Sequence, residues 1–462
     1  MSRVRTAGTL LSAAALTASA PWWLPPNVVR LREHIFTWIN GEEGIPVPGP
    51  GIDAEQFERL YSDPAADGRS VGAGLSDLFW YWLAPGPQMH QEHLEPGPRY
   101  RTVAKVTRQA LAIPLREAEE LAARRTAAVL DELPLETVTG QRLRDLMMPI
   151  WAEAYYEVVF GEPCPLEARR LIVRNADDVV TALKGCSLRH MDRRDELTQY
   201  LLRRIEAGQV PVTLPADEFS DLETAWYLQG AFFNTAVVQM SEAMAHLLLM
   251  IAQHPDVQDD LVAHLDDDEV LDRVIDEALR VNPLFGIAHR VTTAPIKLPD
   301  RTLPTGSVLL FNYLAFQRTG PAPDDEFRPD RWKTLRRKDA HFIPFGVTAN
   351  RACPARGMAP VMMRAAAREV LRRYALSSSA SHTRSMPNRG PCLLVRRDRP
   401  TPALTGRLKR MRIRDRVDDV TISVTQLVLG TYMVADARRK RLCANYFEEH
   451  PEHGPIKETV TR

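Results

Sequence analysis

The spacing of apolar residues along the chain predicts a mainly helical protein. Apolar side chains recur at three- and four-residue intervals, with charged residues between them, over residues 117–133, 171–205, 222–252 and 257–281. Pro134 follows the first of these segments and is expected to end its helix. The last segment is long enough to hold two helices. Strand signals are few by comparison, so helices are predicted to form most of the fold.

The predicted β structure is small. Residues 296–298, 308–311 and 393–395 are short apolar runs that stand next to proline or glycine turns. We expect all three runs to belong to one sheet system beside the helices. The proline-rich segment 321–329 has no regular period and is predicted to be irregular. The fold class expected from the pattern is therefore mainly α with a small β region.

Composition narrows the function classes. The 462 residues are 45% hydrophobic, which is enough for a large buried core. Lys and Arg number 59 and Asp and Glu also number 59, so the charge balance offers no electrostatic basis for binding nucleic acid. The five cysteines have neither zinc-site nor disulfide spacing, which favours a reducing, cytoplasmic environment.

The N-terminus carries a second signal. Arg3 and Arg5 precede a run of small apolar residues at 10–20, as in a signal peptide. The run is too short and too mildly apolar to span a bilayer, and Trp22 and Trp23 follow it. A folded amphipathic helix or loose membrane contact is favoured over secretion for residues 1–44.

The candidate chemistry centres on Cys353, which stands in a turn-rich loop before a helical pattern. A thiolate in such a loop can ligate a haem iron. Arg351, two residues before it, can pair with a haem propionate, and Phe345 can wall the sulfur side. Taken alone, a buried structural cysteine is the commoner interpretation.

Two further motifs precede the cysteine loop. Glu277 and Arg280 are three residues apart and would face one another on a helix. About fifty residues later, Arg331 follows Phe327-Arg328-Pro329-Asp330 and offers a second arginine. One glutamate between two arginines predicts a buried, charge-neutralised network.

In this order, the motifs resemble those of the cytochrome P450 family. The resemblance has clear landmarks over residues 225–396 and extends more loosely back to residue 45. It implies the cytochrome P450 fold, haem b as the cofactor, and Cys353 as the iron ligand. The other roles implied are propionate binding by Arg351 and Arg290 and a structural triad of Glu277, Arg280 and Arg331.

The loop departs from the pattern of the family. Six residues separate Gly346 from Cys353, where the common spacing is five, and the second glycine of the loop is missing. Ala355 stands where a glycine usually follows the cysteine. Because glycine allows backbone conformations that other residues avoid, we expect an extra residue in the turn, with the sulfur still delivered to the iron.

The helix expected to cross the haem, from residue 226 onward, departs further. The resemblance implies an acid followed by an alcohol that relays protons there. One register places Val238 and Gln239 at these positions, and a register one turn earlier places Asn234 and Thr235 there. Neither register supplies a carboxylate. Both pairs remain candidate catalytic positions.

Residues 88–101 hold a further candidate site. His90, Glu92, His93 and Glu95 have a spacing that could bind a metal. The favoured interpretation is instead the loop before a helix at the haem edge. Tyr100, Arg101 and Lys105 are then candidates for a propionate contact.

The resemblance implies oxidative tailoring of a small organic molecule, in specialised metabolism, by a monooxygenase-type enzyme. Electrons would come from a separate ferredoxin and ferredoxin reductase or a similar donor. The alternatives are redox-neutral or peroxide-driven chemistry (lyase, isomerase or cyclase), a non-catalytic haem-binding protein, and a helical protein outside the family.

The predicted domain organisation has three parts. Residues 1–44 form the N-terminal segment, 45–398 the haem domain, and 399–462 a basic helical extension. The extension contains a predicted helix at 424–446 with basic residues at 438–441. A solvated helix packed on the body is favoured over a docking surface for an acidic electron donor or a carrier protein.

Overall fold

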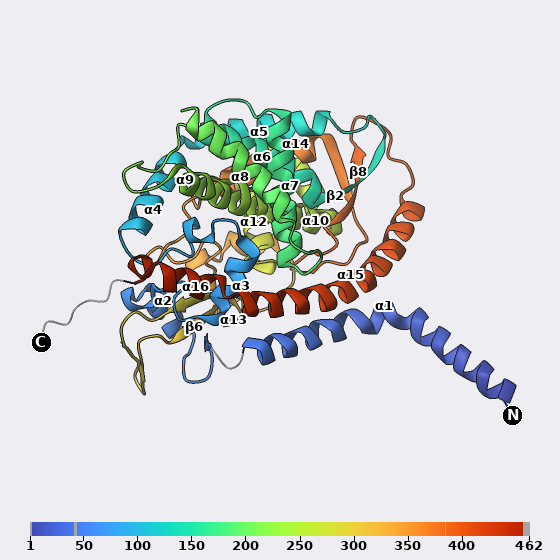
Figure 1. Cartoon of the computed structure of the whole chain (residues 1–462). Helices are drawn as coiled ribbons and strands as arrows, with labels where there is room; N and C mark the ends of the chain where they lie inside the picture. Colours follow the sequence, from blue (N-terminus) through green and yellow to red (C-terminus); the bar gives the residue numbers. More distant parts are fainter. Residues whose placement is uncertain (1, 41–43, 384, 456–462) are drawn as a thin grey trace, which may run out of the picture.

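A computed structural model describes residues 2–40, 44–383 and 385–455 (Figure 1). Helices form most of it. The longer helices are α1 (Ser2–Asn40), α4 (Pro98–Ala110), α5 (Leu115–Asp131), α6 (Leu143–Phe160), α7 (Leu166–Leu183), α8 (Met191–Glu206), α10 (Val237–Gln253), α12 (Asp268–Val281), α14 (Met358–Arg373) and α15 (Thr405–Lys440). The shorter helices are α2 (Glu55–Ser62), α3 (Gly74–Leu83), α9 (Asp221–Leu228), α11 (Pro255–Ala263), α13 (Tyr313–Arg318) and α16 (Leu442–Glu449).

The strands form two three-stranded sheets and one two-stranded sheet. In the first sheet, β6 (Val308–Asn312) pairs in parallel with β1 (Ile45–Val47) and antiparallel with β3 (Ile287–Val291). The second sheet is antiparallel and has the order β2 (Val138–Arg142), β8 (Pro391–Arg396), β7 (Tyr374–Ser377). β4 (Ile296–Lys297) pairs with β5 (Thr302–Leu303).

The expectation of a single sheet system is wrong, because β8 pairs with β2 and β7 and not with the strands of the first sheet. The packing on the outer face of β8 explains why this strand is separate from the first sheet. Leu393 and Val395 pack with Val138 of β2, and Leu408 and Met411 of α15 cover them. Leu393 and Val395 are thus buried under the C-terminal helix, whereas Leu394 packs into the main core.

The predicted helical segment 171–205 is interrupted. It forms most of α7 and nearly all of α8, which are separated by residues 184–190. Gly185 follows α7 with φ +71°, a left-handed conformation that favours glycine. A Cβ on Gly185 would also lie 3.3 Å from the Cα of Gly430 in α15. The C-terminal helix therefore packs closely where α7 ends.

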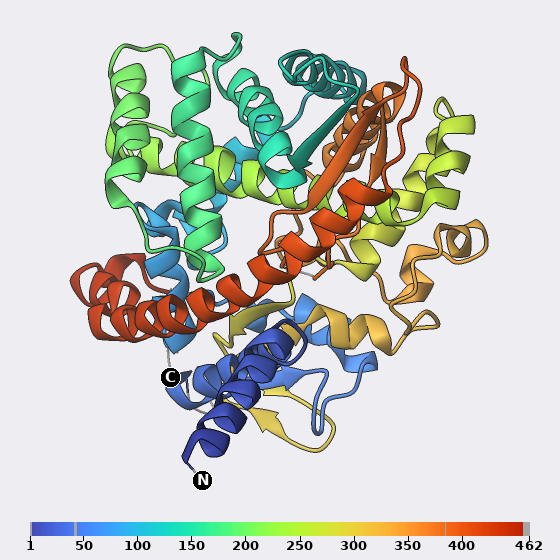
Figure 2. The same cartoon turned by 90° about the vertical axis from the view of Figure 1, so that its right-hand side faces the viewer.

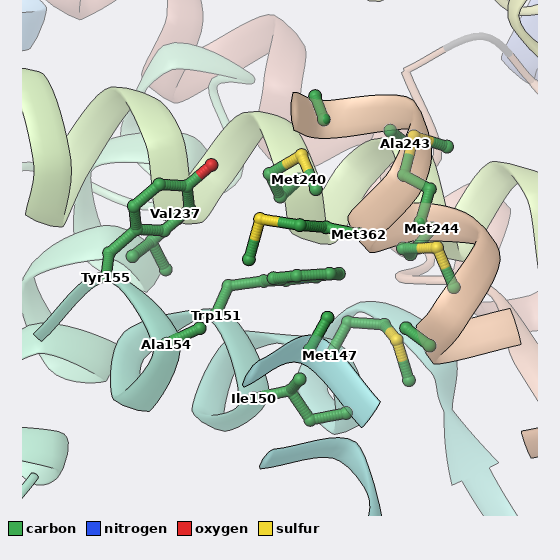
Figure 3. Close-up of a cluster of buried hydrophobic side chains, with 14 of the residues drawn as sticks. Met147, Ile150, Trp151, Ala154, Tyr155, Val237, Met240, Ala243, Met244 and Met362 are labelled. Carbon is green, nitrogen blue, oxygen red and sulfur yellow. The ribbon is translucent and has the colours of Figure 1, made fainter. Parts of the chain in front are cut away.

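The core lies between α6, α10 and α14, with α5 packed on the outside of α6 and α14. Figure 3 shows its centre, where Trp151 of α6 lies among Met240 and Met244 of α10 and Met362 of α14. All four side chains are buried. Methionine has a flexible side chain that fills irregular gaps between helices, and this packing fixes the position of α10.

The N- and C-terminal helices lie together on one side of the body (Figures 1 and 2). α1 packs against α15, and its N-terminal part extends beyond the body. α15 is anchored to α3, since Met433, Val434 and Ala437 are buried against Leu78 and Trp82. The helix predicted at 424–446 therefore starts earlier, at Thr405, and is broken at Arg441 (φ +46°), after which α16 begins.

Candidate functional site

The predicted acid–base network is assembled around Glu277 on α12. Arg280 donates from Nε and Nη2 to the two carboxylate oxygens, at 2.9 Å each. Arg331 donates from Nε to Oε1, also at 2.9 Å, and Trp332 donates from Nε1 to Oε2. The backbone N–H of Arg328 completes the set at 2.9 Å. Glu277 is fully buried, so its charge is balanced entirely by these donors.

The same network holds the irregular segment before the cysteine loop in place. Arg280 also donates to the backbone carbonyls of Ala322, Asp324 and Glu326, at 2.7–3.1 Å. A charged donor that satisfies several buried carbonyls contributes more than a neutral one. The segment lacks regular structure, and Arg280 provides the hydrogen bonds that a helix or strand would otherwise supply.

The cysteine loop is closed by its own backbone. The N–H of Cys353 donates to the carbonyl of Phe345 at 2.9 Å. Gly346 has φ +74°, and Arg351 itself takes a left-handed conformation with φ +52°. Asn350 anchors the loop by donating to the carbonyls of Tyr61 and Ala66, at 2.7 and 3.0 Å. The longer loop, without its second glycine, is therefore built on an arginine in the left-handed region and an asparagine anchor.

Cys353 lies deep in the protein, yet it is partly accessible. Burial raises the pKa of its thiol, and the backbone N–H of Ala355 acts against that rise by donating to the sulfur. Burial, with a smaller contribution from Cys353, raises the pKa of Tyr155 on α6. The helix that holds Tyr155, α6, packs against α10, and Figure 3 shows both helices at the centre of the core. The sulfur is thus near the helical core that contains α10.

Three arginines gather beside this loop. Arg351 pairs with Asp67 at 2.8 Å and donates to the carbonyl of Leu94 at 2.7 Å. Arg69 pairs with Asp67 and Glu92, at 3.2 Å each, and donates to Asn350 Oδ1 at 2.7 Å.

The third arginine, Arg290 on β3, lies 3.8 Å from Glu92 and donates to the hydroxyl of Tyr61 at 2.9 Å. All three guanidinium groups are nearly inaccessible to solvent. The sequence-predicted pair Arg351 and Arg290 is therefore brought to one buried cluster.

This arginine cluster has more donor capacity than its carboxylates use. Nε of Arg69 and Nε of Arg290 are buried without a hydrogen-bond partner. Burial and repulsion from Arg290 and Arg351 lower the pKa of Arg69 to about 10, despite Glu92 and Asp67. The carboxylate of Glu95 is occupied elsewhere, by the backbone N–H groups of residues 69–71. A further anionic group would be stabilised here.

Glu92 is the carboxylate that lies between Arg69 and Arg290 in the cluster. Its side chain is 40% accessible to solvent. Burial opposes its ionisation, but Arg69, Arg290 and Arg351 together lower the pKa of Glu92 below its usual value. The three arginines therefore favour the ionised form of Glu92.

The other residues predicted to contact the haem differ in how deeply they are buried. Tyr100 is partly buried on α4, and the guanidinium of Arg351 lies 3.5 Å from its ring centroid. Arg101, the next residue, is exposed to solvent, as is Lys105. Phe345 packs partly buried against the main core. A propionate contact from Arg101 stays a prediction.

The long helix over the core changes its winding at the predicted positions. α9 and α10 form one continuous helix through a π-helical stretch, Gln229–Ala236. Such wide turns are rare in proteins overall, and those that occur are often found at functional sites. Gln229 donates to Asn175 at 3.0 Å, and Asn175 donates to the carbonyl of Phe233 at 3.4 Å. The amide side chain of Asn175 on α7 therefore supports the widened turn.

His90 meets this stretch from outside the helix. Its Nε2 lies 2.5 Å from Oγ1 of Thr235. The ring also packs on the helix at Gly230, where a Cβ would lie 3.5 Å from the imidazole. Burial lowers the pKa of His90, so the ring is neutral near pH 7. Thr235 therefore has an imidazole partner where the sequence offered no carboxylate.

The other three candidate positions on this helix lie close to Thr235. Asn234 is buried, whereas Val238 and Gln239 are half-buried in the first turn of α10. Val238 packs against the main core. Only the earlier register, Asn234 and Thr235, places a hydroxyl in contact with a titratable side chain among the described residues.

The metal site considered at residues 90–95 is not formed. Among the described residues, the one set of three histidine, cysteine or acidic side chains with mutually close ligand atoms is His450, Glu452 and His453. That set lies near the C-terminus and is partly exposed. The rings of His90 and His93 instead lie close together at a tilted angle of 45°, with their centroids 5.2 Å apart.

Several residues of the site escaped the sequence analysis. Asp67, Arg69 and Asn350 are single polar residues with no local pattern, and two of them are more than 280 positions from the loop that they support. Arg69 had one usable signal, since it stands among small residues and turns at 66–74. His90 and Glu92 were noticed only as possible metal ligands.

Sequence comparison identifies relatives of this chain. The family described as Cytochrome P450 matches residues 185–403. A putative cytochrome P450 135B1 of Mycobacterium tuberculosis is 33% identical over 146 residues, which cover 29% of this chain and 31% of the relative. Cyclooctat-9-en-7-ol 5-monooxygenase of Streptomyces melanosporofaciens is 29% identical over 132 residues, which cover 24% of this chain and 28% of the relative. The chain thus spans about a third of the length of these relatives.

Solved structures share the fold over most of the chain. A cytochrome P450 of Thermus thermophilus, described as 6-coordinated, matches with a TM-score of 0.57 and 19% identity, covering 73% of this chain and 90% of that one. A cyanobacterial P450 with bound retinoic acid matches with a TM-score of 0.58 and 16% identity, covering 74% and 87%. The predicted fold, mainly α with a small β region in the P450 arrangement, is confirmed.

Proposed function

Because the chain belongs to the cytochrome P450 family, we propose that it is a haem-thiolate enzyme of the monooxygenase type that oxidises a small organic molecule. The observation that carries the proposal is the buried arginine cluster beside the Cys353 loop. The proposed cofactor is haem b. The reaction would belong to specialised metabolism, and the enzyme would work in the cytoplasm. Electrons would come from a separate ferredoxin and its reductase.

The residues present fit a haem. Cys353 offers a partly accessible sulfur in a backbone-closed loop, and a thiolate is a known axial ligand of haem iron. Arg69, Arg290 and Arg351 would hold the propionates, since two of them have a buried Nε without a partner. When bound through this sulfur, haem supplies the activation of dioxygen, which thiolate donation favours.

The residues of the chain itself would control protons. His90 Nε2 and Thr235 Oγ1 share one hydrogen bond, and a neutral imidazole can donate or accept it according to its tautomer. We assign Thr235 as the hydroxyl that faces the reaction and His90 as the residue that orients it. Asn234 would keep the widened turn in place, and Val238 and Gln239 would border the substrate side. These four roles are proposals.

Peroxide-driven or redox-neutral chemistry is the second candidate. Asn234, Thr235, Val238 and Gln239 include no carboxylate, and the partner of Thr235 is a histidine with a lowered pKa. Protons for dioxygen cleavage would then have to pass through an imidazole instead of a carboxylic acid. This favours peroxide as the oxidant, because peroxide already carries protons on its oxygen atoms. The substrate class of either reaction is suggested only by the unsaturated alcohol, cyclooctat-9-en-7-ol, in the name of the Streptomyces relative.

One experiment separates these reactions. The haem-loaded protein is screened with cyclooctat-9-en-7-ol and other unsaturated cyclic alcohols by the spectral change on binding. A bound compound is then incubated with a ferredoxin, its reductase, NADPH and isotopically labelled dioxygen. One labelled oxygen in the product supports the monooxygenase. Product formed with peroxide and no reductant supports the second candidate, and product formed with neither supports a redox-neutral reaction. Failure to incorporate haem would overturn all of them.

A further inference from the structure

Exposed apolar side chains concentrate on the two terminal helices. Of the 19 exposed large hydrophobic residues among the described side chains, 11 lie on α1 and α15. Three tryptophans of α1 are among them: Trp22, Trp23 and Trp38 are 62%, 42% and 83% exposed. Exposed hydrophobic residues scattered singly need no explanation, but a cluster of this kind marks an interaction site.

On α15 the exposed apolar residues form a stripe. Ile413, Val417, Val424, Val428 and Tyr432 are separated by intervals of four and seven residues, which keep them on one side of a helix. The stripe extends over roughly 30 Å of helix. The opposite side of α15 packs on the body, through Met433, Val434 and Ala437.

Basic side chains flank the apolar stripe. The segment 405–441 contains ten lysines and arginines against four aspartates. Six of the ten lie within residues 407–416, interleaved with Ile413 and all exposed, whereas Asp415 is buried against Asn388 and Ser381. The guanidinium of Arg416 also lies 4.9 Å from the ring centroid of Trp22 on α1. The two helices thus share one cationic and apolar surface.

The C-terminal helix α15 is not placed to cross a membrane. Two helical stretches of the described chain are long and apolar enough to do so, 221–253 and 405–449. The first is the buried core helix of the fold. The second is fixed along the body, where Gln426 donates to the carbonyl of Lys184 at 2.8 Å and Tyr81 donates to Asp436 at 2.9 Å. α15 can therefore lie in an interface but cannot span it while folded.

We propose that α1 and α15 together form a docking surface that lies flat on an anionic lipid bilayer. This inference goes beyond the proposed oxidation, since it concerns where the enzyme works and not what it catalyses. Tryptophan is enriched at membrane interfaces, and helices that bind there combine an apolar face with lysine and arginine. The phosphates of anionic lipids complement the basic segment 407–416, and the apolar stripe enters the headgroup region.

Binding to vesicles tests the proposal directly. The full chain is mixed with vesicles of phosphatidylcholine alone, or with one third phosphatidylglycerol, and bound protein is measured by flotation. Much tighter binding is expected to the anionic vesicles, weakening at high salt. Bromine atoms on the acyl chains are expected to quench tryptophan emission in the bound state. Equal binding to both vesicle types, or none, would overturn the proposal.

Charge variants assign the surface. Neutralising Lys409, Arg410 and Arg412 to Gln is expected to weaken anionic vesicle binding up to about a hundredfold, from roughly fivefold for each side chain. The matched control neutralises Arg108, Arg170 and Arg203, which are exposed elsewhere, and is expected to bind like the wild type. An equal loss in both triple variants would show non-specific attraction and would overturn the assignment.

Apolar variants test the stripe and the competing occupant. Replacing Trp38, Val424 and Val428 by Ser is expected to abolish bromine quenching and most binding, whereas Leu135→Ser with Leu166→Ser, exposed on other parts of the body, leaves both unchanged. Circular dichroism checks that each variant is folded. If the stripe variant retained vesicle binding but changed the molar mass in solution, the surface would join two copies of the chain, and the proposal would be wrong.

Discussion

The imidazole Nε2 of His90 lies 2.5 Å from the hydroxyl Oγ1 of Thr235. The two residues come from separate parts of the fold, a loop before α4 and the π-helical stretch before α10. The same loop reaches the cysteine side, because the carbonyl of Leu94 accepts a hydrogen bond from Arg351 at 2.7 Å. A short segment therefore links the threonine of the long helix to the arginine beside Cys353.

Removing His90 tests its proposed role in positioning Thr235. His90→Phe leaves the hydroxyl without its partner, and a positioned acid–base group commonly contributes about 10²–10⁴-fold to rate. We expect product formed per electron consumed to fall by at least tenfold, with hydrogen peroxide released instead. His90→Gln, which can still hydrogen-bond, should lie between the two.

A spectroscopic control separates this role from a structural one. The stretching frequency of carbon monoxide on the reduced haem reports polar groups near the iron and should shift in His90→Phe. His264→Phe, on an exposed histidine at the C-terminal end of α11, should change neither quantity. Unchanged coupling and an unchanged stretching frequency in His90→Phe would contradict the assignment.

Glu277 should be essential for stability. Replacing it with Gln leaves Arg280 and Arg331 with a neutral partner, and breaking a buried ion pair from one side costs about 3–5 kcal/mol. Denaturant unfolding should report a loss of that size. Asp330→Asn, which removes a charge from an exposed pair with Lys333, should cost under about 1 kcal/mol. Similar losses in the free energy of unfolding would show that the buried network stabilises the fold no more than an exposed ion pair does.

Acid should destabilise the protein through its buried histidines. Burial, with repulsion from Arg290, lowers the pKa of His289 to about 4. The folded state therefore binds fewer protons than the unfolded state between about pH 6.5 and 4, so stability falls as pH decreases through that window. The contribution of His289 is of order 3 kcal/mol. In His289→Asn, the free energy of unfolding should depend less on pH there; an unchanged slope would argue against a buried neutral ring.

Two glycines with the same backbone conformation isolate the contact between α7 and α15. Gly185 and Gly208 have φ values of +71° and +66°, but only Gly185 has a neighbour, Gly430 of α15, near its missing Cβ. Both alanine variants bear the cost of the left-handed conformation, about 1 kcal/mol. We expect Gly185→Ala to lose more stability than Gly208→Ala, by thermal unfolding. Equal losses of stability in the two variants would mean that α15 shifts to make room for the added methyl group.

The parts of the site that have local sequence patterns were predictable. Glu277 and Arg280 are one turn apart on a helix, and Arg331 stands in a recognisable run before the loop, so their meeting followed from the motifs. Cys353 and Arg351 were found for the same reason. The geometry of a few neighbouring residues on one helix or loop depends little on the tertiary fold, so a local pattern can be recognised from the sequence.

The partners that come from distant parts of the chain were not predictable. Asp67 meets Arg351, and Arg69 meets Asn350, across more than 280 residues, and only the tertiary fold sets these distances. The pairing of β8 with β2 likewise depends on partners some 250 residues apart. The break between α7 and α8 had a usable signal in Gly185, but an apolar period on both sides concealed it.

The most direct test of the account is the spectrum of the reduced, carbon monoxide-bound protein after loading with haem. Wild type and Cys164→Ala should show the strongly red-shifted band of a thiolate-ligated haem, because Cys164 lies outside the site. Cys353→Ala should lose that band while keeping its helical content. A wild-type protein without the band, or a Cys353→Ala variant that retains it, would contradict the assignment of Cys353 as the iron ligand.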